Sequence, residues 1–145
     1  MADHDPLLPV DSDTGDQIGR EPVWDIALVV AAGGALGGGA RHLVSSLIPH
    51  QGWPWNTFVE NVVGCLLLGV LMVLLLEVWR PRKYTRPFLG VGVLGGFTTF
   101  SAFTVETHGL LAEGRGVAAM TYMFGSVACG LLATWIGITV TRRLR

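Results

Sequence analysis

Gly90-Val-Gly-Val-Leu-Gly-Gly-Phe-Thr-Thr-Phe-Ser-Ala-Phe103 places four glycines and several hydroxyl side chains within one long apolar segment. Glycine and threonine are poor helix formers, so this stretch predicts a break, at Gly95–Thr99, in a helix that crosses a membrane. Broken backbone at membrane depth is tolerated only where it is buried in protein or lines a cavity, and its freed carbonyls can hold a cation. Close helix packing through small residues is the alternative role for these glycines. It is the preferred role for two pairs in the first segment, Gly33 with Gly37 and Gly34 with Gly38.

Three further apolar segments accompany this one along the chain. Half of all residues are hydrophobic and only 14% are charged. Helices of a soluble bundle need a polar face, whereas these segments are apolar on nearly every face. Each has about 20 residues or slightly more, enough to cross a hydrocarbon core. The sequence therefore predicts an all-α membrane protein with four transmembrane helices, the third broken near its centre: Trp24–Leu47, Thr57–Trp79, Pro87–Leu111 and Val117–Val140.

Most charged residues lie outside these segments or near their ends. Acidic side chains crowd into residues 1–22, which we expect to form a disordered cytoplasmic tail. Residues 23–141 form the membrane domain, and residues 142–145 form a basic C-terminal tail. Basic residues favour the cytoplasmic side, so both termini are expected in the cytoplasm. Only Arg115 then lies on the outer side, whereas the inner side holds Arg20, Arg80, Arg82, Lys83, Arg86, Arg142, Arg143 and Arg145.

A few polar side chains lie within the spans. Such groups are costly at membrane depth and usually face a partner or a water-filled space. Phe97, Phe100 and Phe103 recur every three residues, which ordinarily indicates packing, but the positive edges of aromatic rings can also face an anion. The intramembrane polar candidates are Arg41, Glu60, Asn61 and Glu106.

The residues themselves leave several functions open. An enzyme is not predicted, because the chain has no nucleophile–base pair, phosphate loop or metal-ligand cluster. A small proton-coupled exporter of the multidrug type would use Glu60 as its intramembrane carboxylate. A non-transporting assembly protein is a third possibility. A broken helix beside Phe100 and Phe103 favours a channel over both.

The run Gly95-Gly-Phe-Thr-Thr-Phe-Ser-Ala-Phe103, followed by Glu106, resembles the signature of the small bacterial fluoride channels of the Fluc or CrcB type. The resemblance extends over about residues 26–140. It implies an antiparallel dimer with two pores that exports fluoride passively across the inner membrane. Hydrogen fluoride enters from acidic surroundings and dissociates inside, which would trap the ion. The other similar segments are Gly37–Arg41 in the first helix, Thr57–Gly64 in the second, and the pair Tyr122 and Ser126 in the fourth.

The same resemblance implies roles for individual residues. Arg41 and Glu106 match vestibule positions. The backbone carbonyls of Gly95 and Thr98 match those that hold a structural sodium ion, which is not transported, at the dimer interface. The residues that match the fluoride path are Phe100, Phe103, Asn61, Ser101, Tyr122, Ser126 and, more distantly, Thr104.

The chain departs from the family pattern in three places. Asn56 stands where the family often has glycine, and Ala102 where it often has threonine. Glu60 precedes Asn61 and would repel an anion, but neighbours on a helix point about 100° apart, so we expect Glu60 to face elsewhere. A chain that forms an antiparallel homodimer must insert in both orientations, so its basic residues should be divided almost evenly between the two sides of the membrane. In this chain they are concentrated on one side. The partner is therefore either a second copy or an oppositely oriented homologue, embedded with it in membrane lipid.

Overall fold

The computed structural model describes residues 23–48, 52–79 and 83–145, which form four helical rods. The predicted acidic tail, residues 1–22, lies outside the described residues. Two of the elements, η1 and η2, are π-helical. The elements in chain order are α1 (Val23–Leu47), α2 (Trp55–Val73), η1 (Leu74–Val78), η2 (Pro87–Leu94), α3 (Gly95–Phe97), α4 (Phe100–Ala112) and α5 (Gly116–Arg143).

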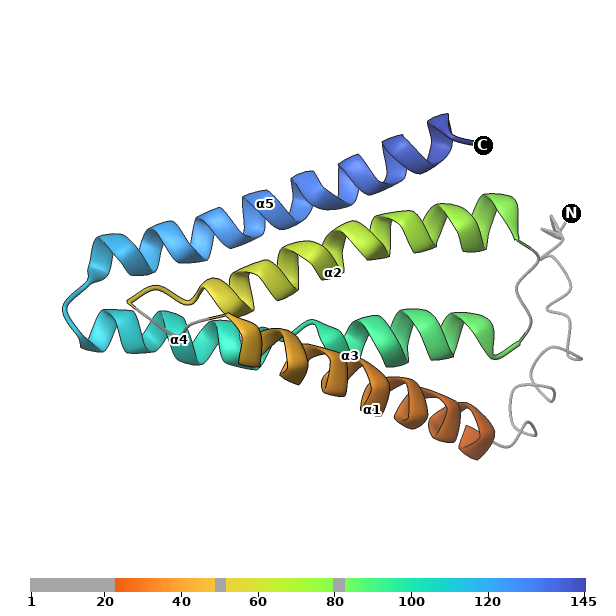
Figure 1. Ribbon diagram of the computed structural model, residues 1–145, viewed down its shortest axis with the longest axis horizontal. Coiled ribbons are helices and arrows are strands. Elements are labelled where there is room, and N and C mark those ends of the chain that lie inside the picture. The colour runs from red at the N-terminus through yellow and green to blue at the C-terminus, as the bar shows by residue number, and fades with distance from the viewer. Residues whose placement is uncertain (1–22, 49–51, 80–82) are drawn as a thin grey trace, which may run out of the picture.

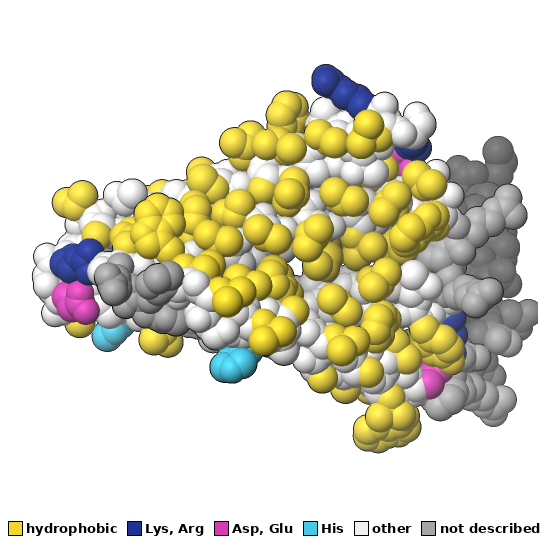
Figure 2. Space-filling model, viewed as in Figure 1, with side chains coloured by type: hydrophobic (Ala, Val, Ile, Leu, Met, Phe, Trp, Pro, Cys, Tyr) yellow, Lys and Arg dark blue, Asp and Glu magenta, His cyan; other side chains and the backbone are white. Residues whose placement is uncertain are grey.

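Each rod is long and apolar enough to cross a membrane: Val23–Leu47, Trp55–Val78, Pro87–Ala112 and Gly116–Arg143. Large hydrophobic side chains are exposed along all four, such as Leu36, Leu67, Val91 and Leu131. Figure 2 shows hydrophobic side chains over most of the visible face and charged ones near its ends. An exposed surface of this kind requires lipid rather than water around it. The chain is a multi-pass membrane protein, as predicted.

The rods pack as two pairs. α2 lies along α5, and α1 lies along η2 and α3 (Figure 1). Glycines bring backbones together in both pairs. A Cβ atom on Gly137 would lie 2.5 Å from the carbonyl oxygen of Leu66, and one on Gly33 would lie 2.5 Å from that of Phe88. Gly37 is buried against the same rod as Gly33, so the predicted packing role is confirmed for this pair. A Cβ atom on Gly34 or Gly38 would meet no described atom within 4 Å, so close packing does not require glycine at the other predicted pair.

The third rod is interrupted at Thr98 and Thr99, near its centre. Thr98 has φ −80° and ψ 155°, and Thr99 has φ −144° and ψ 127°, so both are extended. The break predicted at Gly95–Thr99 is therefore confirmed, and it lies at the threonines of that range rather than at its glycines. Gly92 lies inside η2, where a Cβ atom would come within 2.9 Å of the Gly33 Cα. Gly92 and Gly96 pack against α1, whereas the β-branched threonines, which favour extended backbone, form the break.

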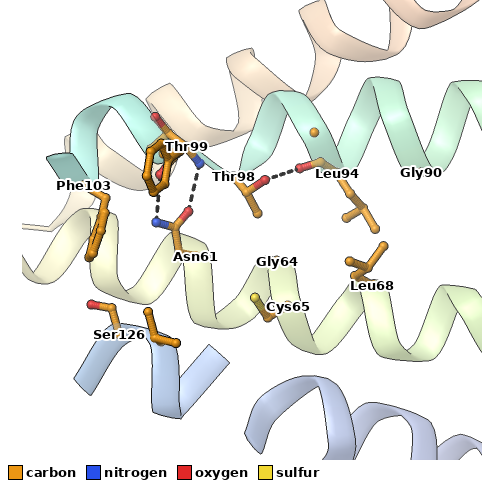
Figure 3. Close-up of a pocket in the computed structure, with 13 residues that line it drawn as sticks. Asn61, Gly64, Cys65, Leu68, Gly90, Leu94, Thr98, Thr99, Phe103 and Ser126 are labelled. Atoms are coloured by element: carbon orange, nitrogen blue, oxygen red, sulfur yellow. Dashed lines mark hydrogen bonds between the residues drawn. The ribbon is translucent and has the colours of Figure 1, made fainter. Parts of the chain in front are cut away.

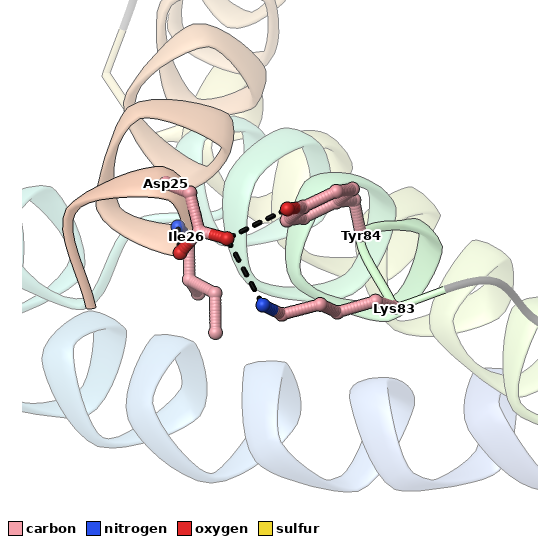
Figure 4. Close-up of polar contacts among 4 residues, drawn as sticks. All are labelled: Asp25, Ile26, Lys83 and Tyr84. Atoms are coloured by element: carbon pink, nitrogen blue, oxygen red, sulfur yellow. Dashed lines mark hydrogen bonds and ion pairs between the residues drawn. The ribbon is translucent and has the colours of Figure 1, made fainter. Parts of the chain in front are cut away.

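One end of the bundle holds the start of α1, the end of η1, the start of η2 and the end of α5 (Figure 1). There the Oδ2 atom of Asp25 accepts hydrogen bonds from Lys83 Nζ at 3.0 Å and from the Tyr84 hydroxyl at 2.6 Å (Figure 4). Asp25 lies in the first turn of α1, where a negative charge also interacts favourably with the helix dipole. This contact ties α1 to the segment that leads into η2.

A second polar contact at the same end ties η1 to α5. Glu77 Oε1 lies 2.6 Å from Arg142 Nη2, and Arg145 pairs with the other carboxylate oxygen. Arg142 and Arg143 form the last turn of α5. The helix therefore includes Arg142 and Arg143, the first two residues of the predicted basic tail.

Candidate ion pathway

The amide of Asn61, on α2, holds the break in the third rod. Asn61 Nδ2 donates to the Thr99 carbonyl oxygen at 2.9 Å, and the Thr99 N–H donates to Asn61 Oδ1 at 2.8 Å (Figure 3). The pairing sets the orientation of the amide, since the N–H needs an acceptor and the carbonyl needs a donor. The side-chain nitrogen of Asn61 carries two hydrogens and uses one of them on the Thr99 carbonyl, so its second N–H remains for another acceptor.

The break leaves at least two backbone carbonyls without their helical donors, those of Gly95 and Thr98. In a continuous helix, the Gly95 carbonyl would accept from the Thr99 N–H and the Thr98 carbonyl from the Ala102 N–H. The Thr99 N–H binds Asn61 instead, and the Ala102 N–H binds Thr99 Oγ1 at 3.2 Å. Gly95 and Thr98 are the two residues whose carbonyls were predicted to hold sodium. Their freed oxygens are hard ligands of the kind that suits a small cation.

A groove of about 380 Å³ runs along the break between α2, the third rod and α5 (Figure 3). Phe100 and Phe103 border it with ring centroids 5.8 Å apart and planes inclined by 33°. Phe100 is 80% exposed in the single chain. Asn61 and Ser126 also line the groove, and the buried Ser126 hydroxyl has no hydrogen-bond partner among the described residues. The structure thus brings four of the predicted path residues together.

A second cavity, also of about 380 Å³, lies on the α1 side of the break, and we call it the polar pocket. Arg41 and Glu106, the predicted vestibule residues, both line it. Ser101 lines it too and lies 3.2 Å from the Thr99 hydroxyl, Oγ to Oγ1. Ser101 is therefore on the opposite side of the break from the Phe100–Phe103 groove.

Glu106 is held by two hydroxyl groups. Thr57 Oγ1 donates to Glu106 Oε1 at 2.7 Å, and the Tyr122 hydroxyl donates to Oε2 at 2.7 Å. Tyr122 is fully buried and packs on Phe103, with ring centroids 5.2 Å apart. It borders neither cavity directly, so it contacts the predicted path through Phe103 and Glu106. Thr104 donates to the Phe100 carbonyl at 2.9 Å on the exposed side of α4.

Two residues that hold the break and its surroundings, Thr99 and Thr57, were not identified as site residues from the sequence. Thr99 supplies the backbone groups that Asn61 binds and caps α4, and Thr57 binds Glu106. Thr57 lies four residues before Asn61 on α2, and residues at that spacing share a helix face. This spacing was a signal in the sequence that would have placed Thr57 beside the break.

Glu60 faces away from the Phe100–Phe103 groove, as expected. Its side chain is 1% exposed, and Oε1 accepts a hydrogen bond from the Ser45 hydroxyl on α1 at 2.6 Å. It lines the polar pocket rather than the groove that Asn61 lines. The angular offset between neighbouring helix positions separates the two side chains.

The family model described as "CrcB-like protein, Camphor Resistance (CrcB)" matches residues 28–138. "Fluoride-specific ion channel FluC 1" of Streptomyces coelicolor is 41% identical over 121 residues, covering 82% of this chain and 79% of the relative. "Fluoride-specific ion channel FluC 2" of Nocardia farcinica is 44% identical over 127 residues, covering 85% of this chain and 91% of the relative. "Fluoride-specific ion channel FluC 1" of Mycobacterium bovis is 45% identical over 118 residues, covering 80% of this chain and 89% of the relative. These relatives are named as channels rather than enzymes.

Proposed function

Because the chain belongs to the CrcB-like family, we propose that it is a fluoride-specific ion channel that exports fluoride passively from the cytoplasm. The observation that carries the proposal is the groove beside the break. It combines a spare N–H of Asn61, the unpartnered hydroxyl of Ser126 and the rings of Phe100 and Phe103. These groups are donors or electropositive ring edges, which suit an anion.

Fluoride is small and strongly hydrated, so a pore must replace part of its water shell. In the proposed path the Asn61 amide and the Ser126 hydroxyl donate hydrogen bonds while ring edges of Phe100 and Phe103 approach the ion from the side. The ring contacts are weak, which allows the ion to leave again. Ser101 and Glu106 would serve the polar pocket, where hydroxyl groups border the other side of the break.

The groove is open in the single chain, and Phe100 is largely exposed in it, which supports a partner that closes the pore. We propose an antiparallel dimer with two pores, in which the freed carbonyls of Gly95 and Thr98 hold a structural sodium ion between the subunits. Bound sodium would supply a fixed positive charge at the interface. The charge bias supports cytoplasmic termini in the inner membrane and a partner that is either a second copy or an oppositely oriented homologue.

Efflux from liposomes that contain the full chain tests this proposal. A fluoride electrode should record rapid release of fluoride, and a chloride electrode should record no comparable release of chloride. Absence of fluoride release, with this chain alone and with an oppositely oriented homologue added, would overturn the proposed function. Robust release from the chain alone would exclude an obligate homologous partner.

The proton-coupled exporter is the alternative, since Glu60 is a buried carboxylate. It predicts that transport stops without a pH gradient and that Glu60→Gln abolishes it. The channel predicts that fluoride release continues in both cases. Measuring release with equal pH on both sides of the bilayer separates the two functions.

A further inference from the structure

The proposed path uses Asn61 but leaves the preceding residue, Glu60, without a role. Glu60 lies in the second span with 1% of its surface exposed. A carboxylate at this depth is costly and is normally found where it acts on a partner or an ion. Within the described residues its one hydrogen bond comes from Ser45, at 2.6 Å.

The polar pocket brings three charged side chains together: Arg41 from α1, Glu60 from α2 and Glu106 from α4. Arg41 has no ion pair within the described residues, so its charge acts on the pocket itself. Glu106 is engaged by hydroxyl groups on both oxygens. Glu60 is the remaining charge that borders the same space as Arg41 without contacting it. An anion in the pocket would feel attraction from Arg41 and repulsion from Glu60 together.

We propose that Glu60 is a counter-charge to Arg41 that weakens the retention of fluoride in the polar pocket and so allows the ion to leave quickly. The inference rests on the proposed channel function and concerns the vestibule of the same path. A conducting site must bind its ion well enough to admit it and weakly enough to release it. An uncompensated arginine in a membrane-buried pocket would hold a small anion tightly, and Glu60 opposes that hold.

Two single variants separate the charge of Glu60 from its contact with α1. Glu60→Gln removes the charge but keeps a side-chain oxygen that can accept from Ser45. Ser45→Ala removes that hydrogen bond but keeps the charge. Both are measured as the full chain in liposomes, by the fluoride concentration at half-maximal efflux and the maximal rate, with thermal unfolding in detergent to verify folding.

We expect Glu60→Gln to lower the half-saturating fluoride concentration about tenfold, the effect of about 1.4 kcal/mol, and to lower the maximal rate. Arg41→Gln should shift half-saturation in the opposite direction, and the double variant should lie between the two single variants. Unchanged half-saturation in Glu60→Gln would overturn the inference while leaving the channel intact. An equal shift in Ser45→Ala would also overturn it, because Glu60 would then act as a tether between α1 and α2. If the native chain released no fluoride, the proposed function itself would have failed.

Discussion

Replacing Asn61 by leucine should destabilise the break in the third rod and lower the free energy of unfolding. The substitution keeps a side chain of similar shape but removes the bonds to the Thr99 N–H and carbonyl, at 2.8 Å and 2.9 Å. Thr99 is only 9% exposed, so water does not readily replace the amide. Leaving a buried donor or acceptor unpaired costs about 1–3 kcal/mol each, so the total loss of stability should be about 2–6 kcal/mol.

Asn61→Asp is the matched comparison. Its carboxylate can still accept from the Thr99 N–H but cannot donate to the Thr99 carbonyl, so it should lose about half as much. Ser126→Ala is the control, since that hydroxyl has no hydrogen-bond partner among the described residues. It should leave the unfolding temperature unchanged while fluoride efflux falls.

Two measurements test this reasoning in detergent-solubilised protein. The unfolding temperature, followed by tryptophan fluorescence, should decrease in the order native, Asn61→Asp, Asn61→Leu. Amide hydrogen exchange at Thr99 should accelerate at least thirtyfold in Asn61→Leu, the factor for about 2 kcal/mol, but remain slow in Asn61→Asp. A leucine variant with native exchange and a native unfolding temperature would refute the role of Asn61 as the support of the break.

Three further substitutions test the cap, the packing and the pore. Thr99→Ala removes the cap of α4, worth about 0.5–2 kcal/mol, and should lower the unfolding temperature; Thr99→Ser should keep it, and equal losses would refute the cap. Gly137→Ala should destabilise the protein by about 1–3 kcal/mol, because the added methyl group overpacks against Leu66. Gly125→Ala is its control and should leave stability unchanged, because Gly125 has open space around it. Equal losses of stability in the two variants would contradict close backbone packing at Gly137. Phe100→Ile should lower fluoride efflux from liposomes without changing stability, and unaltered efflux would remove Phe100 from the path.

The number and type of spans could be predicted because hydropathy is a local property of each segment. Twenty or so apolar residues must span a bilayer whatever they pack against. The position of the break was predicted only to within Gly95–Thr99, where glycines and threonines stand together. Glycine is a poor helix former in isolation, but the backbone of α1 packs closely on Gly92 and stabilises a helical conformation there. Tertiary contact decided between the glycines and the threonines.

The hydrogen-bond partners of the site residues could not be predicted from local sequence patterns either. Asn61 was predicted to donate to an ion, yet its amide also holds Thr99, 38 residues away in the chain. Tyr122 was predicted to line the path, yet its hydroxyl binds Glu106 from another rod. The register between rods decides both contacts, and a single sequence does not contain it. The resemblance did identify which residues gather near the break, and the roles assigned to them stay predictions.

The third rod belongs to both helix pairs at once. Its first half, η2 and α3, packs on α1, whereas α4 packs on α5. Thr98 and Thr99, between the two halves, have extended rather than helical backbone, although the Thr98 N–H still donates to the Leu94 carbonyl at 3.0 Å. An extended residue spans about 3.3 Å and a helical one about 1.5 Å, so this segment can lengthen or shorten more easily than the helices beside it. We therefore expect Thr98 and Thr99, which are held by the hydrogen bonds between Asn61 and Thr99, to adjust when a change in bilayer thickness shifts one helix pair against the other, beside the proposed ion path.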